Sequence, residues 1–169
     1  RRPRDYGMTL CLGGGEVSLL ELVGAYTVFP GLGIWRPPLI LDGKDPPRSQ
    51  RRRIFSAGSA ATVLDALSTE DHLSRSGVMP AEYRGPRLGY KTGTSFGLRD
   101  AWTVAFSSSW VVGVWMGDAS GRSRPGLIGG QAALPLALPL CMDLSAGTAP
   151  GWPRTQELVE RDVCSLSGQ

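Results

Sequence analysis

Two stretches in the first half of the chain repeat apolar residues in steps of three and four, the spacing of the buried face of a helix. Ser18, with Glu21 three residues later, has the pattern of a capping box, so the first helix is expected to begin there. It is expected to end at Pro30, because proline cannot continue a helix. Its apolar positions are Leu19, Leu22, Val23, Tyr26 and Phe29.

The second predicted helix begins at Ser56, whose hydroxyl can cap it, and fades near Ser68. Its face for burial consists of Ala60, Val63, Leu64 and Leu67. Before it, residues 36–53 hold four prolines and three consecutive arginines, which predicts an exposed, turn-rich connection with one short strand at 39–41. After it, residues 71–86 are predicted to form a polar loop.

From residue 88 the pattern changes from the period of a helix to that of strands. Three runs rich in β-branched and aromatic residues, 88–96, 100–107 and 110–117, are separated by short polar turns. They predict an antiparallel three-strand meander over about 88–117. The Ala- and Leu-rich stretch 129–144 contains two prolines, so it is expected to be a kinked or broken helix that packs across this sheet.

The composition suits one small globular domain, with 169 residues of which 41% are hydrophobic and 20% charged. The longest apolar stretches, 110–117 and 132–142, fall short of the roughly 20 residues that a membrane helix needs, so no membrane span is predicted. The chain opens on Arg1 without an apolar signal sequence and is interpreted as an internal fragment.

The formal charge of +3 and the arginine run at 51–53 raise the possibility of nucleic-acid binding. Such binding needs more than basic charge, for example a helix-turn-helix, a zinc finger or aromatic residues between the arginines, and none of these patterns accompanies the run. The arginines are interpreted as a solvated loop. A basic nucleic-acid binder stays the third alternative, which salt-dependent binding would reveal.

Metal and disulfide chemistry find little support in the sequence. The three cysteines, Cys11, Cys141 and Cys164, form no Cys-x-x-Cys pair, and the single histidine, His72, has no companion at metal spacing. No metal site and no cofactor are therefore expected, and His72 is expected at the surface. One disulfide or three free thiols are both compatible with the spacing.

Two overlapping motifs at the first predicted strand suggest different chemistry. Residues 93–97 match the Gly-x-Ser-x-Gly nucleophile elbow of α/β-hydrolases, whereas residues 91–93 read Lys-Thr-Gly. The elbow requires a helix directly after the serine and a histidine further along the chain, but no histidine follows Ser95 and the next predicted element is another strand. Ser95 is therefore interpreted as an ordinary strand hydroxyl.

The Lys-Thr-Gly tripeptide suits a substrate-binding strand. Lys91 offers a positive charge to a substrate carboxylate, Thr92 and Thr94 add hydroxyl groups, and Gly93 allows a close approach to the backbone. The amide of Thr94 can point at a developing oxyanion. Strict alternation puts Lys91 on the opposite face from Thr92 and Thr94, so their convergence requires twist at Gly93 and use of the strand edge.

Further stretches extend this pattern along most of the chain. They are residues 6–22, 34–38, 99–102, 110–118 and 129–135, and the closing residues 163–168. Together with residues 91–95, they resemble the transpeptidase domain of class A penicillin-binding proteins in sequence and spacing. The last stretch is similar to the junction with the extra C-terminal domain of the 1C type.

The resemblance implies the α+β fold of penicillin-binding proteins and serine β-lactamases, an α/β sandwich, present here as a partial domain. It also implies serine acyl transfer that cross-links peptidoglycan stem peptides ending in D-Ala-D-Ala, with β-lactams as inhibitors and no cofactor. Lys91, Thr92 and Thr94 would hold the terminal carboxylate, Gly93 would permit its approach, and the Thr94 N–H would be an oxyanion donor. The implied location is the periplasmic face of the bacterial inner membrane.

Other catalytic residues of that family are missing from this sequence. No serine precedes a lysine by three residues and there is no asparagine, so the chain forms neither the nucleophile motif nor the Ser-x-Asn motif. Residues 1–148 are therefore predicted to be the C-terminal half of a transpeptidase domain, inactive without its N-terminal half, and residues 149–169 a linker towards a further domain. The alternative is a non-catalytic module that binds cell-wall peptides or β-lactams.

Overall fold

The computed structural model describes residues 5–38, 50–68, 70–80, 82–159 and 164. The strand predicted at 39–41 lies outside the described residues, as does most of the stretch 163–168. None of the helices in the described part of the chain has the length and apolar character that a membrane crossing needs.

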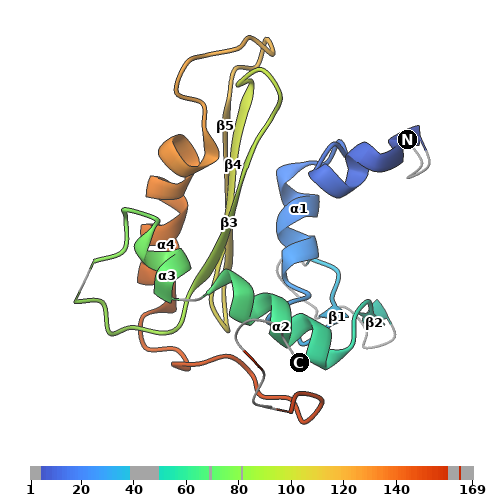
Figure 1. The fold of residues 1–169 in the computed structure, drawn as a ribbon, viewed down its shortest axis with the longest axis vertical. Coiled ribbons are helices and arrows are strands. Elements are labelled where there is room, and N and C mark those ends of the chain that lie inside the picture. The colour runs from blue at the N-terminus through green and yellow to red at the C-terminus, as the bar shows by residue number, and fades with distance from the viewer. Residues whose placement is uncertain (1–4, 39–49, 69, 81, 160–163, 165–169) are drawn as a thin grey trace.

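The centre of the fold is an antiparallel sheet of three strands (Figure 1). In spatial order these are β3 (Gly89–Thr94), β4 (Asp100–Phe106) and β5 (Val111–Gly117). Each strand pairs with the next one in the chain, and the register places Val104 between Lys91 and Gly113. The predicted meander is therefore confirmed.

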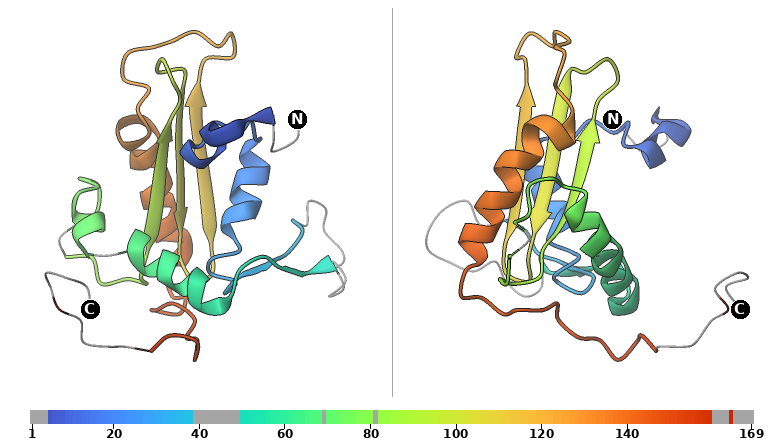
Figure 2. Two further views of the ribbon diagram at one scale, coloured as in Figure 1. Left: turned by 45° about the vertical axis from the view of Figure 1, so that its right-hand side comes forward. Right: turned by 60° about the vertical axis from the view of Figure 1, so that its left-hand side comes forward.

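Helices cover both faces of the sheet, as Figure 2 shows. On one face lie α4 (Leu134–Ser145) and the short π-helical segment η4 (Gly129–Ala133) that precedes it; on the other lie α1 (Leu19–Tyr26) and α2 (Ala57–Leu67). Because side chains alternate along a strand, each face has its own core. The first core joins Leu88, Tyr90, Ala105 and Val112 to Leu134, Ala137, Leu138 and Cys141; the second joins Leu64 to Val104 and Phe106.

The two predicted helix starts are confirmed by their caps. At α1 the Glu21 amide donates to the Ser18 hydroxyl at 3.3 Å and the Ser18 amide donates to the Glu21 carboxylate at 2.8 Å, which completes the capping box. At α2 the Ser59 amide donates to the Ser56 hydroxyl at 3.0 Å. The first helix ends at Tyr26, earlier than predicted, because a series of turns begins there before Pro30 is reached.

The helix predicted across the sheet is present, but neither proline breaks it, because α4 is continuous over Leu134–Ser145. A π-helical turn occupies η4, and α4 follows with Pro139 in its interior. Pro135 lies in the first turn of α4, directly after η4, and has no N–H to donate to a carbonyl of that preceding turn.

Four elements differ from the prediction or were not predicted. Arg52–Arg53 form strand β2, paired with β1 (Ile34–Trp35), so the arginine run is exposed as expected but belongs to a small ribbon and not to a loop. A short helix, α3 (Glu70–Ser74), begins the segment predicted as a polar loop. Near the start of the chain, Gly7–Leu12 form the 3-10 helix η2.

The residues after Thr148 return along the domain. The Arg87 amide donates to the Pro150 carbonyl at 2.7 Å, and the Trp152 indole donates to the Ser68 hydroxyl at 2.9 Å. The Gly58 amide donates to the Glu157 carboxylate at 2.7 Å, which connects this segment to the first turn of α2. The assignment of residues 149–169 as a linker to another domain stays a prediction.

Candidate functional site

The Lys-Thr-Gly tripeptide lies on β3, an edge strand that pairs with β4 alone among the described strands. Main-chain groups of an antiparallel edge strand point alternately to the neighbour and to the open side. The Ser95 amide donates to the Asp100 carbonyl across the pair, whereas the Tyr90 carbonyl accepts from His72 on the open side. By this alternation the N–H and C=O groups of Thr92 and Thr94 face the open edge.

Lys91 reaches the same edge although its side chain starts on the other face. Its Cβ is on the α1 and α2 face, in register with Val104, but its ammonium donates to the Thr92 carbonyl at 2.6 Å. The side chain is exposed to solvent. A positive charge, a carbonyl and the Thr94 N–H therefore lie along one open strand edge.

The side chain of Thr94 is engaged on the face of the sheet and not at its edge. Its hydroxyl accepts a hydrogen bond from the Gly129 amide at 3.0 Å, which joins β3 to the start of η4. At Gly93 a methyl group would lie 3.6 Å from the Cβ of Trp102, an ordinary contact, so no described neighbour requires glycine there. The close approach to Gly93 comes from Gly129, on the α4 face.

His72 was expected at the surface, and that expectation is wrong. Its ring is partly buried and stacks on Tyr90, with ring centres 4.2 Å apart. His72 Nε2 lies 2.9 Å from the Tyr90 carbonyl, and the Tyr90 hydroxyl donates to the His72 carbonyl at 2.9 Å. The cause is α3, which places this residue beside the start of β3; the i,i+4 pair of Asp71 and Arg75 was the sequence signal for that helix.

The competing nucleophile elbow is absent. Ser95 directly follows the antiparallel strand β3, and the turn after it leads into β4 and not into a helix. The Ser95 hydroxyl accepts from the Asp100 amide at 2.8 Å, so it has the structural role of a strand and turn hydroxyl. Phe96 on this turn is 99% exposed.

A loop that the sequence did not single out holds this turn in place. Residues 118–128 connect β5 to η4, and the Arg124 amide donates to the Leu98 carbonyl at 3.0 Å. Within the loop, Asp118 accepts from the Ser120 hydroxyl at 2.6 Å and pairs with the Arg124 guanidinium at 2.7 Å. The bonds from Ser120, and then Arg124, lower the pKa of Asp118 to about 2.

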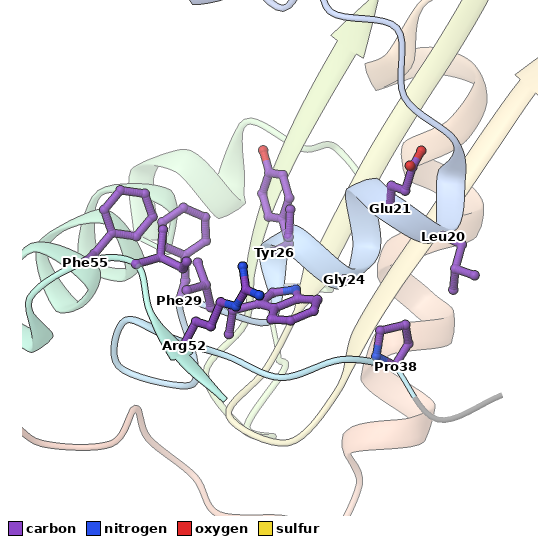
Figure 3. Close-up of a pocket in the computed structure, with 12 residues that line it drawn as sticks. Leu20, Glu21, Gly24, Tyr26, Phe29, Pro38, Arg52 and Phe55 are labelled. Carbon is purple, nitrogen blue, oxygen red and sulfur yellow. The ribbon is translucent and has the colours of Figure 1, made fainter. Parts of the chain in front are cut away.

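Other polar and apolar features lie away from this edge. In the described part of the chain, no group of three His, Cys, Asp or Glu residues could hold a metal ion. Cys11 and Cys141 are free thiols, and burial raises the pKa of Cys141 to about 11. An apolar cavity of about 670 Å³ lies between α1 and the β1–β2 ribbon, with Leu20, Phe29 and Phe55 in its lining (Figure 3).

Comparison with known proteins identifies the relatives of this chain. Penicillin-binding protein 1C of Escherichia coli (strain K12) is 30% identical over 164 residues, which make up 96% of this chain and 20% of that protein. The chain is a homologue of penicillin-binding proteins. Penicillin-binding protein 1A of Aquifex aeolicus (strain VF5) is 30% identical over 140 residues, 76% of this chain and 19% of that protein. Penicillin-binding protein 4 of Bacillus subtilis (strain 168) is 28% identical over 123 residues, 67% of this chain and 19% of that protein.

The chain thus spans about a fifth of the length of these penicillin-binding proteins. No family model matches it. The resemblance drawn from the sequence is confirmed by the relatives, and the sheet packed between helices agrees with the α+β fold that it implied.

Proposed function

We propose that this chain carries the substrate-binding strand of a D,D-transpeptidase that cross-links peptidoglycan. The observation that supports the proposal is the edge of β3, where the Lys91 ammonium reaches the Thr92 carbonyl at 2.6 Å and the Thr94 N–H faces outward, in a chain homologous to penicillin-binding proteins. The resemblance of residues 91–95 and of the stretches around them to the transpeptidase domain adds the reaction type.

In the proposed reaction, a serine hydroxyl attacks the carbonyl carbon of the penultimate D-alanine of a stem peptide. The amide bond breaks, the terminal D-alanine leaves with the proton, and an ester joins the peptide to the enzyme. An amine of a neighbouring strand then attacks this ester, forms the cross-link and releases the serine. A β-lactam is attacked in the same way, and its opened ring stays on the serine.

The residues of β3 have two roles in this proposal. The Lys91 ammonium, with Thr92 and Thr94, holds the terminal carboxylate of the donor peptide or of the β-lactam, while Gly93 permits its approach. The Thr94 N–H donates to the oxyanion of the tetrahedral intermediate. One such donor is worth about 2.7–4 kcal/mol of barrier.

The nucleophile is proposed to come from a preceding half of the domain, because residues 1–169 contain no Ser-x-x-Lys and no Ser-x-Asn sequence. Residues 1–148 then form the C-terminal half, without activity of their own, and residues 149–169 lead towards another domain. The partners are stem peptides ending in D-Ala-D-Ala, at the periplasmic face of the inner membrane.

The test is the intact mass after incubation with a penicillin. Two proteins are compared: this chain alone, and a longer protein that extends upstream through the preceding half of the domain. We expect one penicilloyl adduct on the longer protein and none on the chain alone. A stable adduct on the chain alone would contradict the missing nucleophile; no adduct on a folded longer protein would contradict the transpeptidase.

A non-catalytic module that binds cell-wall peptides or β-lactams is the second candidate, since the chain has the carboxylate-binding strand without a nucleophile motif. The upstream gene sequence separates the two. A serine three residues before a lysine there favours the enzyme, and saturable, non-covalent penicillin binding by a protein without that serine favours the module.

A further inference from the structure

We infer that Gly129 is a positioning residue for Lys91–Thr94 of β3. The hydroxyl groups of Thr94 and Thr103 hold the amide and the carbonyl of Gly129 against the α4 face of that strand. The inference rests on the proposed function, since it concerns where the oxyanion donor of Thr94 lies. Gly129 lies outside the Lys-Thr-Gly motif, since it follows Thr94 by 35 positions and belongs to η4.

Two threonines from neighbouring strands bind the polar groups of Gly129. The Gly129 amide donates to the Thr94 hydroxyl at 3.0 Å, and the Thr103 hydroxyl donates to the Gly129 carbonyl at 3.2 Å. Thr103 lies directly opposite Thr92 in the sheet and is only 1% exposed, so its hydroxyl has no competing water. The first residue of η4 is therefore fixed to β3 and β4 together.

The contact leaves no space for a side chain on Gly129. A methyl group there would lie 2.5 Å from the Gly93 carbonyl oxygen, 2.6 Å from the Trp102 carbonyl oxygen and 3.0 Å from the Gly93 nitrogen. Real Cβ atoms do not approach other atoms within 3.0 Å, and these neighbours are backbone atoms that cannot rotate away. Either β3 or the start of η4 would have to move.

The crowded atoms belong to the peptide groups that the proposed site uses. The Gly93 carbonyl and the Thr94 N–H are two ends of one planar peptide, so pressure on the oxygen displaces the oxyanion donor. The Gly93 nitrogen belongs to the peptide of the Thr92 carbonyl, which accepts from the Lys91 ammonium. Packing on one side of the strand thus fixes both groups that would face a substrate on its edge.

The neighbouring Gly130 is a matched control. A methyl group on Gly130 would have no described atom within 4 Å apart from its chain neighbours and the backbone of its own helix, so Gly130→Ala adds the same methyl group one position later without the contact. The buried threonine provides a second, milder pair: Thr103→Val removes the hydroxyl that donates to the Gly129 carbonyl, whereas Thr103→Ser keeps it.

The experiment measures acylation by a fluorescent penicillin in the longer protein that contains the whole site. The rate constant at saturating penicillin, the half-saturating concentration and the labelled fraction are recorded for each variant. We expect Gly129→Ala to lower the saturating rate constant at least about tenfold with a smaller change in half-saturation, because an oxyanion contact acts mainly in the transition state. Gly130→Ala should stay within about twofold of wild type.

The threonine pair keeps the inference testable if Gly129→Ala fails to fold. We expect Thr103→Val to lower the rate constant about threefold or more and Thr103→Ser to leave it unchanged. The inference is overturned if Gly129→Ala is acylated at the wild-type rate, or if this variant loses only labelled fraction and keeps its rate constant. It is also overturned if Thr103→Val and Thr103→Ser have the same rate constant. A wild-type protein that forms no adduct overturns the proposed function, and the inference with it.

Discussion

At the scale of single residues, the Lys91 side chain reaches the strand edge although side-chain alternation places it on the opposite face from Thr92 and Thr94. Its side chain begins on the face that α1 and α2 cover, and its ammonium ends at the carbonyl of the next residue, Thr92. The charge is thereby held beside the outward main-chain groups of the strand. This local bond prepares the ammonium for an anionic ligand, because a carboxylate can replace the neutral carbonyl as a stronger acceptor.

Lys91→Ala in the longer protein is expected to lower the rate constant of acylation by a penicillin about tenfold or more. A hydrogen bond between charged groups contributes about 1.5–3 kcal/mol, which corresponds to that range. The decisive comparison uses the penicillin and its methyl ester: wild type should prefer the free acid, and Lys91→Ala should not. Arg75→Ala, which removes an exposed cation from the turn directly after α3, is the control. An unchanged preference in Lys91→Ala would refute the carboxylate-binding role.

At the scale of elements, the strand is supported by segments that follow it in the chain. Residues 118–128 fix the β3–β4 turn through the bond from the Arg124 amide to Leu98, and η4 fixes the strand itself through Gly129. Leu98 has a positive φ of 55°, a backbone conformation that a leucine rarely adopts. The loop 118–128 therefore holds the β3–β4 turn in a backbone conformation that a leucine at position 98 does not favour.

Acid is expected to release this loop only at very low pH. The pKa of Asp118 is lowered from 3.8 to about 2 by its bonds to Ser120 and Arg124. A carboxyl with a lowered pKa in the folded state contributes stability above its unfolded pKa and loses it as the pH falls through the folded value. The carboxyl resonance of Asp118 should therefore titrate near pH 2, and Asp118→Asn should remove that titration. A midpoint at pH 4 would contradict the ion pair.

Most elements could be predicted because they bury one periodic face. The helices at Ser18 and Ser56 and the three strands have both the right spacing and clear end signals. The β1–β2 ribbon could not be predicted, because its two-residue strands pair residues 17 and 19 positions apart and bury no periodic face. The helix α3 was missed for a similar reason, since five residues give too short a pattern.

The sequence indicated which strand holds the candidate site, but it could not give the geometry of that site. The types of residue at 91–94 indicated a carboxylate-binding strand, but the bond from Lys91 to the Thr92 carbonyl depends on the local path of the side chain. The contact of Thr94 with Gly129 depends on tertiary packing between segments 35 positions apart. Neither is encoded in a short motif.

At the scale of the whole molecule, the described part of the chain leaves apolar surface uncovered. Leu20, Ile54 and Phe55, beside the cavity of Figure 3, are 52%, 53% and 44% exposed. Within the described strands, the outer edges of β3 and β5 have no strand partner. Open edges and exposed apolar groups of this kind favour association between chains.

The chain on its own is therefore expected to self-associate or aggregate, and a longer protein that includes the proposed preceding half of the domain is expected to do so less. Size-exclusion chromatography with light scattering, over a range of concentrations, measures the mass of both. The same samples can be heated to compare cooperativity. A monomeric chain that melts in one cooperative transition would show that residues 1–169 are sufficient for a stable fold.

The contact between Thr94 and Gly129 also sets an order of events during synthesis. The strand that is proposed to bind substrate leaves the ribosome before Arg124 and Gly129. These two residues hydrogen-bond to the strand and its turn, and they come later in the chain. A nascent chain that ends before residue 129 can pair β3 with β4 but lacks the final support of the strand. The contacts that support the strand can therefore form only after residue 129 has been synthesised.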